Sequence, residues 1–394
     1  MRRFHYNLRR FSAVILGIVF LVAGLLKTID PVGTMLIVSE YCKFLHLHFL
    51  LPWAKGIGIF LAVTEASLGI FLTTGVFRKA SAIGSFVLLG IFTPVTLILW
   101  IQNPNMDCGC FGEAIHLTHA QSFIKNVILV LLAVWAFVPF REFGRSPKRK
   151  RLTATVGMLS VLVVSWYSNT HLPAMDFTEF GLGAELFASL EDDLAADNHY
   201  EHTFIYEKNG QRGNFTLTTL PDSSWTFVAI DTVFRNTTAI SSHYPILSFS
   251  DAQGVYHDRR AAEGTVVIFS VYDPQKADWE RLQKQYHAVL EAEGTPYVLI
   301  ASYPEEAATL DIPQELPLYF ADYKTLITLN RSNGGGSYFC EGELINKWSA
   351  GNFPDDLAEE FTDNPIIVSS RFIIQRRLLS QGFLVYLAAL LMLV

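Results

Sequence analysis

Charged residues are scarce in this chain. Asp, Glu, Lys and Arg make up 17% of its 394 residues, whereas 51% are hydrophobic. Because soluble globular proteins have about 25% charged residues, the composition excludes an ordinary soluble protein and predicts a membrane protein. The sequence also lacks a phosphate-binding loop, a hydrolase nucleophile elbow and a basic nucleic-acid-binding patch. We therefore expect the lipid bilayer, and no nucleic acid, as a partner.

Cysteine is also scarce, with four residues in the chain. Two of them, Cys108 and Cys110, are separated by a single residue in a loop between two apolar segments. A thiol pair with this spacing is a redox couple, half of a metal site or a structural staple. We favour the redox interpretation and test it against the remaining sequence.

Apolar runs of about 20 residues, the length that crosses roughly 30 Å of hydrocarbon, indicate membrane spans. The first run lacks a small-x-small cleavage site, so we expect it to be an uncleaved span. The last run is short for a span, and we expect it to cross the membrane, with the interface or the bundle surface as alternatives. The runs are Phe11–Leu26, Trp53–Thr74, Ala80–Ile101, Phe123–Phe140, Ala154–Trp166 and Leu378–Val394.

Basic residues cluster at the N-terminus, at Arg78 and Lys79, and from Lys148 to Arg151. The excess of Lys and Arg in cytoplasmic loops predicts that all three segments lie on the cytoplasmic side of the membrane. By alternation, the loop with Cys108 and Cys110 faces the outer side, in a compartment where disulfides persist.

A short helix is expected after the first span. Asp30 can cap it, Pro31 can occupy its first turn, and helical spacing of apolar residues leads to Cys42. This helix would bring Cys42 to the same membrane face as the two loop cysteines.

Acidic residues are concentrated in the second half of the chain. Residues 171–370 carry 31 of the 37 acidic residues but 11 of the 30 basic ones, which predicts a soluble domain on the outer side that is able to receive a protein partner. We divide the chain into a four-span bundle, a basic loop with a fifth span, a β-rich subdomain, a degenerate thioredoxin-like subdomain, and a C-terminal hydrophobic helix and probable sixth span. Their residues are 1–141, 142–170, 171–262, 263–370 and 371–394.

The thioredoxin-like prediction depends on element order. From Gly264 onward the pattern indicates β-α-β followed by β-β-α, and upstream Asn209-Gly210 predicts a hairpin turn. The redox couple of a working thioredoxin follows the first strand, but Val271–Trp279 has no cysteine, and Gly334-Gly335-Gly336 replaces the usual proline. We therefore expect a docking or scaffolding α/β module.

Three motifs carry a resemblance to a known family. The first four apolar runs, together with Lys27-Thr28-Ile29-Asp30-Pro31, Glu65 and Asp107-Cys108-Gly109-Cys110-Phe111-Gly112, resemble the DoxX/MauE group of bacterial membrane proteins over Phe11–Phe140. The continuation, with Leu172–Phe177 and Leu220–Val228, is similar to longer members from Bacteroidetes. The resemblance implies a four-helix redox-associated bundle, linked to periplasmic disulfide formation in MauE-like proteins and to thiosulfate and quinone chemistry in DoxX-like proteins.

The candidate catalytic residues are Cys108, Cys110 and Cys42. A disulfide between Cys108 and Cys110 would close a strained ring with a raised reduction potential, and Cys42 would either resolve a mixed disulfide or form a structural bridge. Glu65 is a carboxyl group within a span, so it must be paired, with Lys27 or a hydroxyl, or protonated. It serves either helix packing or a proton or quinone site.

A metal site is the main chemical alternative, suited to zinc or copper. Its candidate ligands are Cys108, Cys110, His116 and His119, with His46 and His48 nearby. The cysteine spacing is not that of a zinc knuckle, so we assign no metal ligand. Cys340, in an apolar strand, is expected in the core.

Besides a metal-binding protein of the periplasmic face, two functions remain open from the sequence. The first is a redox-associated membrane protein in thiol/disulfide or quinone-linked electron transfer during maturation of envelope proteins. The second is a non-enzymatic subunit of a larger envelope complex, in which the cysteines staple the bundle. The sequence therefore leaves open whether the protein is an enzyme, and a membrane quinone is its candidate cofactor.

Overall fold

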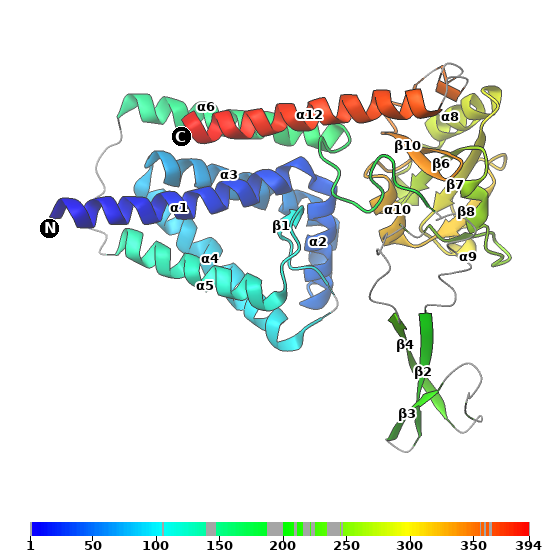
Figure 1. Ribbon diagram of the computed structural model, residues 1–394, viewed down its shortest axis with the longest axis horizontal. Helices are drawn as coiled ribbons and strands as arrows, with labels where there is room; N and C mark the ends of the chain where they lie inside the picture. Colours follow the sequence, from blue (N-terminus) through cyan, green and yellow to red (C-terminus); the bar gives the residue numbers. More distant parts are fainter. Residues whose placement is uncertain are drawn as a thin grey trace.

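A bundle of long helices lies beside a mixed α/β domain in the computed structural model of the chain, and a small three-stranded sheet extends from that domain (Figure 1). The structure describes residues 2–104, 106–138, 147–186, 200–208, 211–215, 221, 225–234, 245, 247–354, 356–357, 360–361 and 365–393.

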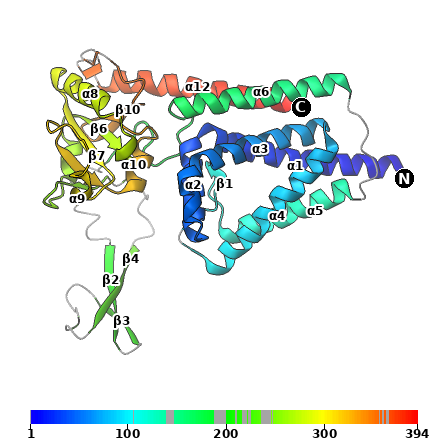
Figure 2. The ribbon, with the colours of Figure 1, turned by 180° about the vertical axis from the view of Figure 1, so that it is seen from behind.

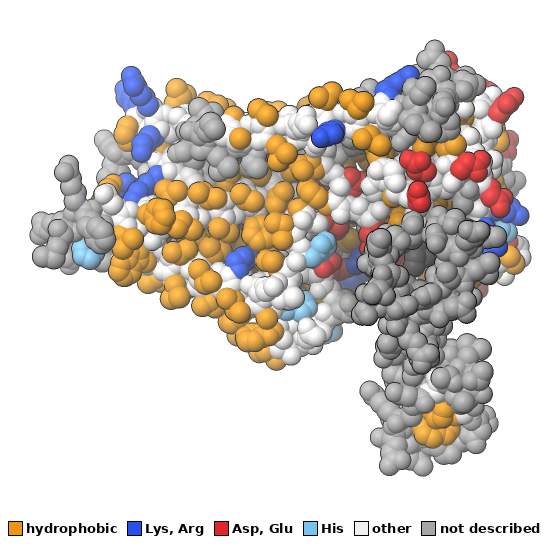
Figure 3. All heavy atoms as spheres, in the orientation of Figure 1, with side chains coloured by type: hydrophobic (Ala, Val, Ile, Leu, Met, Phe, Trp, Pro, Cys, Tyr) orange, Lys and Arg blue, Asp and Glu red, His pale blue; other side chains and the backbone are white. Residues whose placement is uncertain are grey.

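Five of the described helices are long and apolar enough to cross a membrane, which confirms the predicted helical membrane core. Hydrophobic side chains such as Phe60, Ile91 and Leu131 are exposed on them. Hydrophobic side chains cover much of the face of the bundle that Figure 3 shows. Apolar residues on outward as well as inward faces are typical of membrane spans. The helices are α1 (Arg2–Ile29), α3 (Ala54–Thr74), α4 (Arg78–Gln102), α5 (His119–Phe137) and α6 (Lys148–Thr170).

Glycines bring α1 and α3 close together. A Cβ at Gly24 would lie 2.3 Å from the backbone nitrogen of Ala66, and one at Gly69 would lie 2.4 Å from that of Leu21. Small residues allow such close backbone approach between membrane helices, where packing replaces the hydrophobic driving force. This tightly packed pair forms one wall of the candidate site described below.

The basic segments gather at the end of the bundle away from the α/β domain (Figures 1 and 2). There Arg78 donates a hydrogen bond to the Tyr6 hydroxyl at 2.9 Å, and Arg10 donates to the Leu72 carbonyl oxygen at 2.6 Å. Cations at a helix C-terminus are favoured by the helix dipole. The helices therefore alternate in direction as the loop charges predict.

The opposite end of the bundle is built from α2 (Pro31–Phe44), the 3-10 helix η1 (His48–Trp53) and the short strand β1 (Cys110–Glu113). The predicted cap of α2 is confirmed, since the Asp30 carboxylate accepts a hydrogen bond from the Gly33 nitrogen at 2.8 Å. A capping box of Thr118 and Gln121 begins α5. These local signals position the chain on either side of the cysteine loop.

The α/β domain contains a six-stranded sheet in the order β10-β9-β6-β7-β8-β5. Strands β6, β7 and β8 are parallel, whereas β9 is antiparallel to β6 and to β10, as the predicted β-α-β and β-β order requires. We call this sheet and its helices, within residues 247–354, the sheet domain. Its strands are β5 (Phe249–Ser250), β6 (Thr265–Val271), β7 (Thr295–Ile300), β8 (Leu318–Ala321), β9 (Gly335–Cys340) and β10 (Glu343–Trp348), and its helices are η2 (Asp258–Ala262), η3 (Pro274–Lys276), α8 (Trp279–Glu291), α9 (Pro304–Ala307) and α10 (Tyr323–Leu329).

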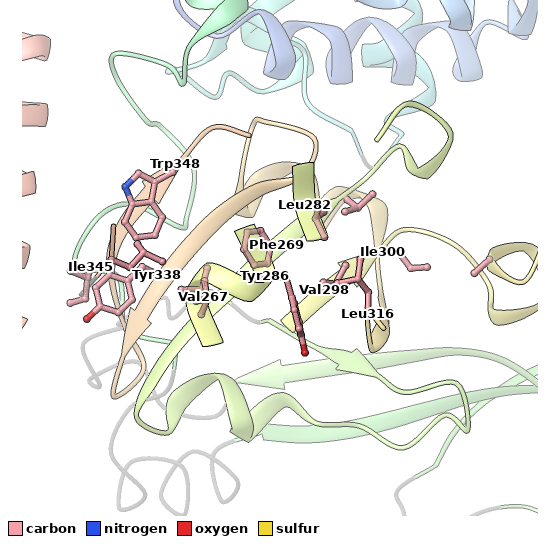
Figure 4. Packing of buried hydrophobic residues seen from close by; sticks show 14 of the residues in the cluster. Val267, Phe269, Leu282, Tyr286, Val298, Ile300, Leu316, Tyr338, Ile345 and Trp348 are labelled. Carbon is pink, nitrogen blue, oxygen red and sulfur yellow. The ribbon is translucent and has the colours of Figure 1, made fainter. Parts of the chain in front are cut away.

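Strand β6 is covered on both faces. Val267 and Phe269 pack with Leu282 of α8 (Figure 4). On the other face, Val266 and Ile268 belong to a second buried cluster with Leu299 and Leu326. Because successive side chains of a strand point to opposite faces, a strand buried on both reads as a continuous apolar run. This explains why the sequence predicts β6 and β7 clearly.

The smaller sheet consists of β2 (Tyr200–Lys208), β3 (Gln211–Phe215) and β4 (Thr226–Phe234), in the order β3-β2-β4. Lys208 pairs with Gln211, which confirms the predicted hairpin, although its Asn209-Gly210 turn lies outside the described residues. Strand β5 also comes from residues 171–262 but pairs with β8, so this segment contributes to both sheets.

The C-terminal helix differs from the prediction. Helix α12 (Pro365–Leu393) begins before both the apolar run Leu378–Val394 and the predicted C-terminal segment 371–394, and it contains Arg371 and Arg377. Arginine interrupts an apolar run but is a good helix former, and proline suits the first turn. The helix packs along α6, where the hydroxyls of Ser160 and Tyr386 are 2.7 Å apart.

Two other predicted helices are not found whole among the described residues. The predicted helix Pro274–Ala292 is divided, because the Asp278 carboxylate caps a new helix, α8, by accepting a hydrogen bond from the Arg281 nitrogen. The predicted helix Pro354–Phe361 falls partly outside the described residues.

Candidate functional site

The cysteine loop, residues 106–113, lies against α2. Gly109 and Gly112 have positive φ angles of 56° and 65°, a conformation that glycine adopts without strain. A Cβ at Gly109 would lie 2.3 Å from Cγ2 of Ile37, and the Tyr41 hydroxyl donates a hydrogen bond to the Cys108 carbonyl oxygen at 2.5 Å. Glycine between the two cysteines is therefore required for both the turn and its contact with α2.

Cys108 is paired with a histidine. Its Sγ lies 2.8 Å from Nδ1 of His119, and Nε2 of the same ring lies 3.0 Å from the Pro104 carbonyl oxygen. A carbonyl oxygen can only accept, so Nε2 carries a proton, and in the neutral ring Nδ1 is then free to accept the thiol proton. The Pro104 carbonyl thus fixes the ring in the tautomer that a base needs.

The surroundings of Cys108 favour its neutral thiol. Burial raises the pKa of the Cys108 thiol above its ordinary value, Cys110 and Asp107 add to this rise, and the nearby Ser122 hydroxyl and Lys125 cation oppose it. Burial also raises the pKa of the Cys42 thiol. Because the thiolate is the reactive form, Cys108 needs a nearby proton acceptor, and His119 is in contact with it.

A cavity of about 230 Å³ opens beneath the loop, among α1, α2, α3, α4 and α5. Its lining is mainly apolar, and it includes Cys42, Cys108, Cys110 and Glu65. The structure therefore brings together all four residues that the sequence selects, and α2 carries Cys42 to the loop cysteines as predicted. All three thiols are free.

Glu65 pairs with Lys27 at the cavity wall. The Lys27 Nζ lies 2.8 Å from both carboxylate oxygens, and the Glu65 side chain is 2% exposed. A buried carboxylate needs such a partner because removing it from water is costly. Of the candidate partners, the structure selects Lys27.

Of the histidines considered as metal ligands, His119 contacts Cys108, whereas His46, His48 and His116 do not line the cavity. Among the described residues, no three His, Cys, Asp or Glu side chains are close enough together to hold a metal ion. His116 instead pairs with Asp107 at 3.2 Å on the surface, and Cys340 is half-buried in β9 against the core of the sheet domain.

Sequence reasoning missed two contributors. His119 was considered only as a metal ligand, although its place at the start of α5 directs it back to the loop. Lys125, six residues later in α5, lines the cavity with its Nζ 4.9 Å from the centre of the Phe111 ring. A basic residue within the first two turns of the helix that follows a cysteine loop was the available signal.

The sheet domain contacts this end of the bundle through Arg331, a residue that the sequence did not single out. The Arg331 guanidinium lies 3.0 Å from the Asp30 carboxylate and 3.1 Å from that of Glu113. Burial lowers the pKa of Arg331, but the two carboxylates raise it by more, so the pKa is higher than usual. The N-cap of α2 and the end of the cysteine loop are thus joined to the sheet domain by one cation.

Comparison with known proteins agrees with this domain arrangement. Residues 7–139 match the family model described as methylamine utilisation protein MauE, and residues 200–234 match a domain of unknown function, DUF8463. Protein TlpB of Flavobacterium psychrophilum is 28% identical over 154 residues, which are 37% of this chain and 39% of that relative. The match thus covers less than half of either protein. No solved structure matches the chain.

The match to the MauE model covers α1 to α5 and the whole cysteine loop. Together with the five apolar helices, it supports a MauE-like membrane domain in residues 7–139.

Proposed function

We propose that this protein performs thiol–disulfide exchange at the periplasmic face of the bacterial inner membrane, during maturation of envelope proteins, with Cys108 and Cys110 as the reacting pair. The orientation is supported by the basic segments, which gather at the end of the bundle opposite the cysteine loop.

The contact between Cys108 and His119 carries the proposal. A buried thiol with a raised pKa is a poor nucleophile unless a base takes its proton, and His119 Nδ1 lies 2.8 Å away with Nε2 anchored on a carbonyl. A nucleophile, a base and a group that orients the base form the usual arrangement for activating a side chain. A purely structural cysteine needs none of these partners.

The exchange oxidises a client protein. One client thiolate attacks a sulfur of a Cys108–Cys110 disulfide and forms a mixed disulfide, while the other sulfur leaves as a thiolate and takes a proton. The second client thiolate then attacks the client sulfur, which releases the reduced Cys108 and Cys110 pair. The client loses two electrons and two protons, and the pair gains them. Cys42, in the same cavity wall, is placed to resolve a trapped mixed disulfide.

His119 acts when the reduced pair is reoxidised, because the Cys108 thiol must then give up its proton. Reoxidation also needs an acceptor, and the cavity fits a lipid-soluble quinone. Its lining is apolar with a few polar groups, among them Lys27, Glu65 and Asn126, which is typical of small-molecule sites. A quinone bound there would supply an acceptor for two electrons and two protons. Lys27 and Asn126 would hold its oxygens, and the surrounding helices would exclude water.

The sheet domain is the proposed binding site for a protein partner. The strand order β10-β9-β6-β7, with β9 antiparallel to β6, supports a thioredoxin-like fold. The segment after β6 has no cysteine, so this domain binds rather than reacts. Acidic side chains are prominent on its surface (Figure 3), which suits a basic partner.

Thiol trapping in native membranes tests the proposal. The wild-type protein and the control Cys340→Ser should shift between oxidised and reduced forms when quinone turnover is blocked and restored, whereas Cys108→Ser and Cys110→Ser should not. If the wild-type pair keeps one redox state throughout and both loop variants still support maturation, the cysteines act as a staple in a non-enzymatic subunit.

A further inference from the structure

A buried hydroxyl on α5 lies beside the cysteine loop. Ser122 is 0% exposed, and its Oγ forms no hydrogen bond with any other described residue. Buried polar groups are nearly always satisfied, so an exception in a candidate site needs an explanation. The hydroxyl is close enough to Cys108 to lower the pKa of that thiol. It therefore has its best acceptor when the Cys108 sulfur carries a negative charge.

Ser122 belongs to one face of α5. It follows His119 by three residues and precedes Lys125 by three, and residues three or four apart lie on the same side of a helix. His119 Nδ1 is 2.8 Å from the Cys108 Sγ, and Lys125 lines the cavity beneath the loop. We call His119, Ser122 and Lys125 the α5 stripe. It faces the cysteine loop.

The three side chains of the α5 stripe act on one sulfur in different ways. His119 can take or return the Cys108 proton. The Ser122 hydroxyl and the Lys125 cation both lower the pKa of the Cys108 thiol, because a hydrogen bond to an ionised acceptor is strong and an opposite charge favours the ionised form. The stripe thus combines a base, a hydrogen-bond donor and a cation at the Cys108 sulfur.

The other groups around Cys108 oppose its ionisation or leave it unchanged. Burial is the largest effect, and Cys110 and Asp107 also raise the pKa of the thiol. From α2, the Tyr41 hydroxyl donates to the Cys108 carbonyl oxygen rather than to the sulfur. The charged form of Cys108, through which exchange passes, therefore depends on the α5 stripe.

The two sulfurs of the pair differ in access. Cys108 is 4% exposed, whereas Cys110 is half-buried. The loop is open to solvent beside them, since the Asp107 side chain is 54% exposed. Which sulfur of a disulfide is attacked depends on access. The sulfur of Cys110 is therefore easier for an arriving thiolate to reach than that of Cys108.

We propose that the client attacks Cys110 and that Cys108 departs as a thiolate, which Ser122 and Lys125 stabilise until His119 returns its proton. This inference rests on the proposed function and assigns a separate role to each cysteine. Ser122 is then a catalytic residue, because its hydroxyl donates to the sulfur that gains charge.

The step balances in electrons and protons. The client thiolate forms a bond to the Cys110 sulfur, the bond between the two cysteines breaks, and its electron pair remains on Cys108. His119, which holds the proton that the client thiol released, passes it to Cys108. The second client thiolate then attacks the client sulfur, and Cys110 leaves with the electron pair of the mixed disulfide and takes the second client proton.

The first test follows the alkylation rate of each loop cysteine against pH. The reduced full-length protein in lipid nanodiscs, in a Cys42→Ser and Cys340→Ser background, reacts with iodoacetamide, and peptide fragmentation assigns the label. Ser122→Ala should raise the Cys108 midpoint by about one pH unit and slow its alkylation at pH 7 about tenfold, because the thiolate loses a charged hydrogen bond. The Cys110 midpoint should move less.

Lys125→Gln should shift the Cys108 midpoint in the same direction, because it removes the nearby cation. Ser85→Ala is the matched control, since Ser85 is also 0% exposed but donates to the Ser81 carbonyl oxygen in α4. It should keep the parent midpoint. If Ser122→Ala and Lys125→Gln also keep it, the α5 stripe does not stabilise the thiolate and the inference is wrong.

Thermal unfolding separates a catalytic from a structural Ser122. Removing a hydroxyl that has no partner loses no hydrogen bond, so Ser122→Ala should unfold at the parent temperature or above it. A lower unfolding temperature, with slower alkylation at every pH but no shift in midpoint, would assign Ser122 to packing.

The second test identifies the attacked sulfur. The same background protein, oxidised with diamide, is mixed briefly with a peptide that has one cysteine, quenched with acid and treated with N-ethylmaleimide. Fragmentation should find the peptide on Cys110 and the maleimide on Cys108 in about tenfold excess over the reverse. Equal or reversed labelling would contradict the assignment of the cysteines but leave the exchange function standing. Shifted midpoints without any peptide adduct would support the α5 stripe and contradict the exchange function.

Discussion

The Sγ of Cys108 lies 2.8 Å from Nδ1 of His119, so the most buried thiol of the cysteine loop is in contact with a group able to take its proton. The partner of the other ring nitrogen, the Pro104 carbonyl at 3.0 Å, makes this contact directional. One thiol of the pair is thus distinguished from the other by its surroundings.

His119→Ala should slow the reaction of Cys108 with a small aromatic disulfide about 100-fold at pH 7, because positioned bases contribute about 10²–10⁴-fold. Stopped-flow absorbance measures the rate. His119→Gln should lose as much, since an amide can donate to the Pro104 carbonyl but cannot take a proton.

His116→Ala is the matched control, because His116 is in the same loop but pairs with Asp107 on the surface. It should remain within about twofold of the wild type. Recovery of the rate in His119→Gln would show that His119 only positions the loop.

The pH dependence of alkylation should report the buried thiol. Burial raises the pKa of Cys108, so the folded protein holds the proton more tightly than the unfolded chain. The resulting stabilisation is fully present below the unfolded pKa, about 8.5, and is lost as the pH rises through the higher folded pKa. The alkylation rate of Cys108 should therefore rise with a midpoint above that measured in denaturant. A native midpoint at or below the denatured one would contradict this environment.

The local features of the fold could be predicted from the sequence. The apolar runs, the Asp30 cap and the Thr118 and Gln121 capping box all depend on residues within a few positions of one another, and the structure contains them. Helix α12 was predicted too short because Arg371 and Arg377 end an apolar run without ending a helix.

The long-range features could not be predicted. The pairing of Cys108 with His119 depends on how the loop folds back onto the start of α5, and Arg331 reaches Asp30 from the far part of the chain. Neither contact leaves a periodic pattern. The sequence could place the thiols at one end of the bundle, but the base beside Cys108 and the contact of Arg331 with the bundle follow from tertiary packing.

Gly109→Ala should destabilise the protein more than Gly112→Ala. Both glycines have positive φ, which costs other residues about 1–3 kcal/mol. A Cβ at Gly109 would also lie 2.3 Å from Ile37, whereas the nearest atom at Gly112 would be 3.7 Å away. Thermal unfolding in detergent should rank the two variants in this order.

Adding Ile37→Ala to Gly109→Ala separates the steric and conformational parts of that cost. In the Ile37→Ala background the added methyl group has room. Gly109→Ala should therefore lower the stability of Ile37→Ala by less than it lowers the stability of the wild type. Additive losses would show that the contact with Ile37 is not the source of the difference.

The pair of Lys27 and Glu65 can be tested as a structural element and as part of the cavity. Lys27→Met leaves the Glu65 carboxylate buried without its cation, so the free energy of unfolding should fall by about 3–5 kcal/mol. The double variant Lys27→Met with Glu65→Leu should recover most of this loss, because apolar replacement of a buried pair is nearly neutral. Unfolding in detergent measures both variants. Quinone-dependent reoxidation of the cysteine pair should remain low in the stable double variant if the two side chains also hold the acceptor. Normal reoxidation in that variant would assign the pair to helix packing alone, because an apolar pair would then restore both the stability and the reoxidation rate.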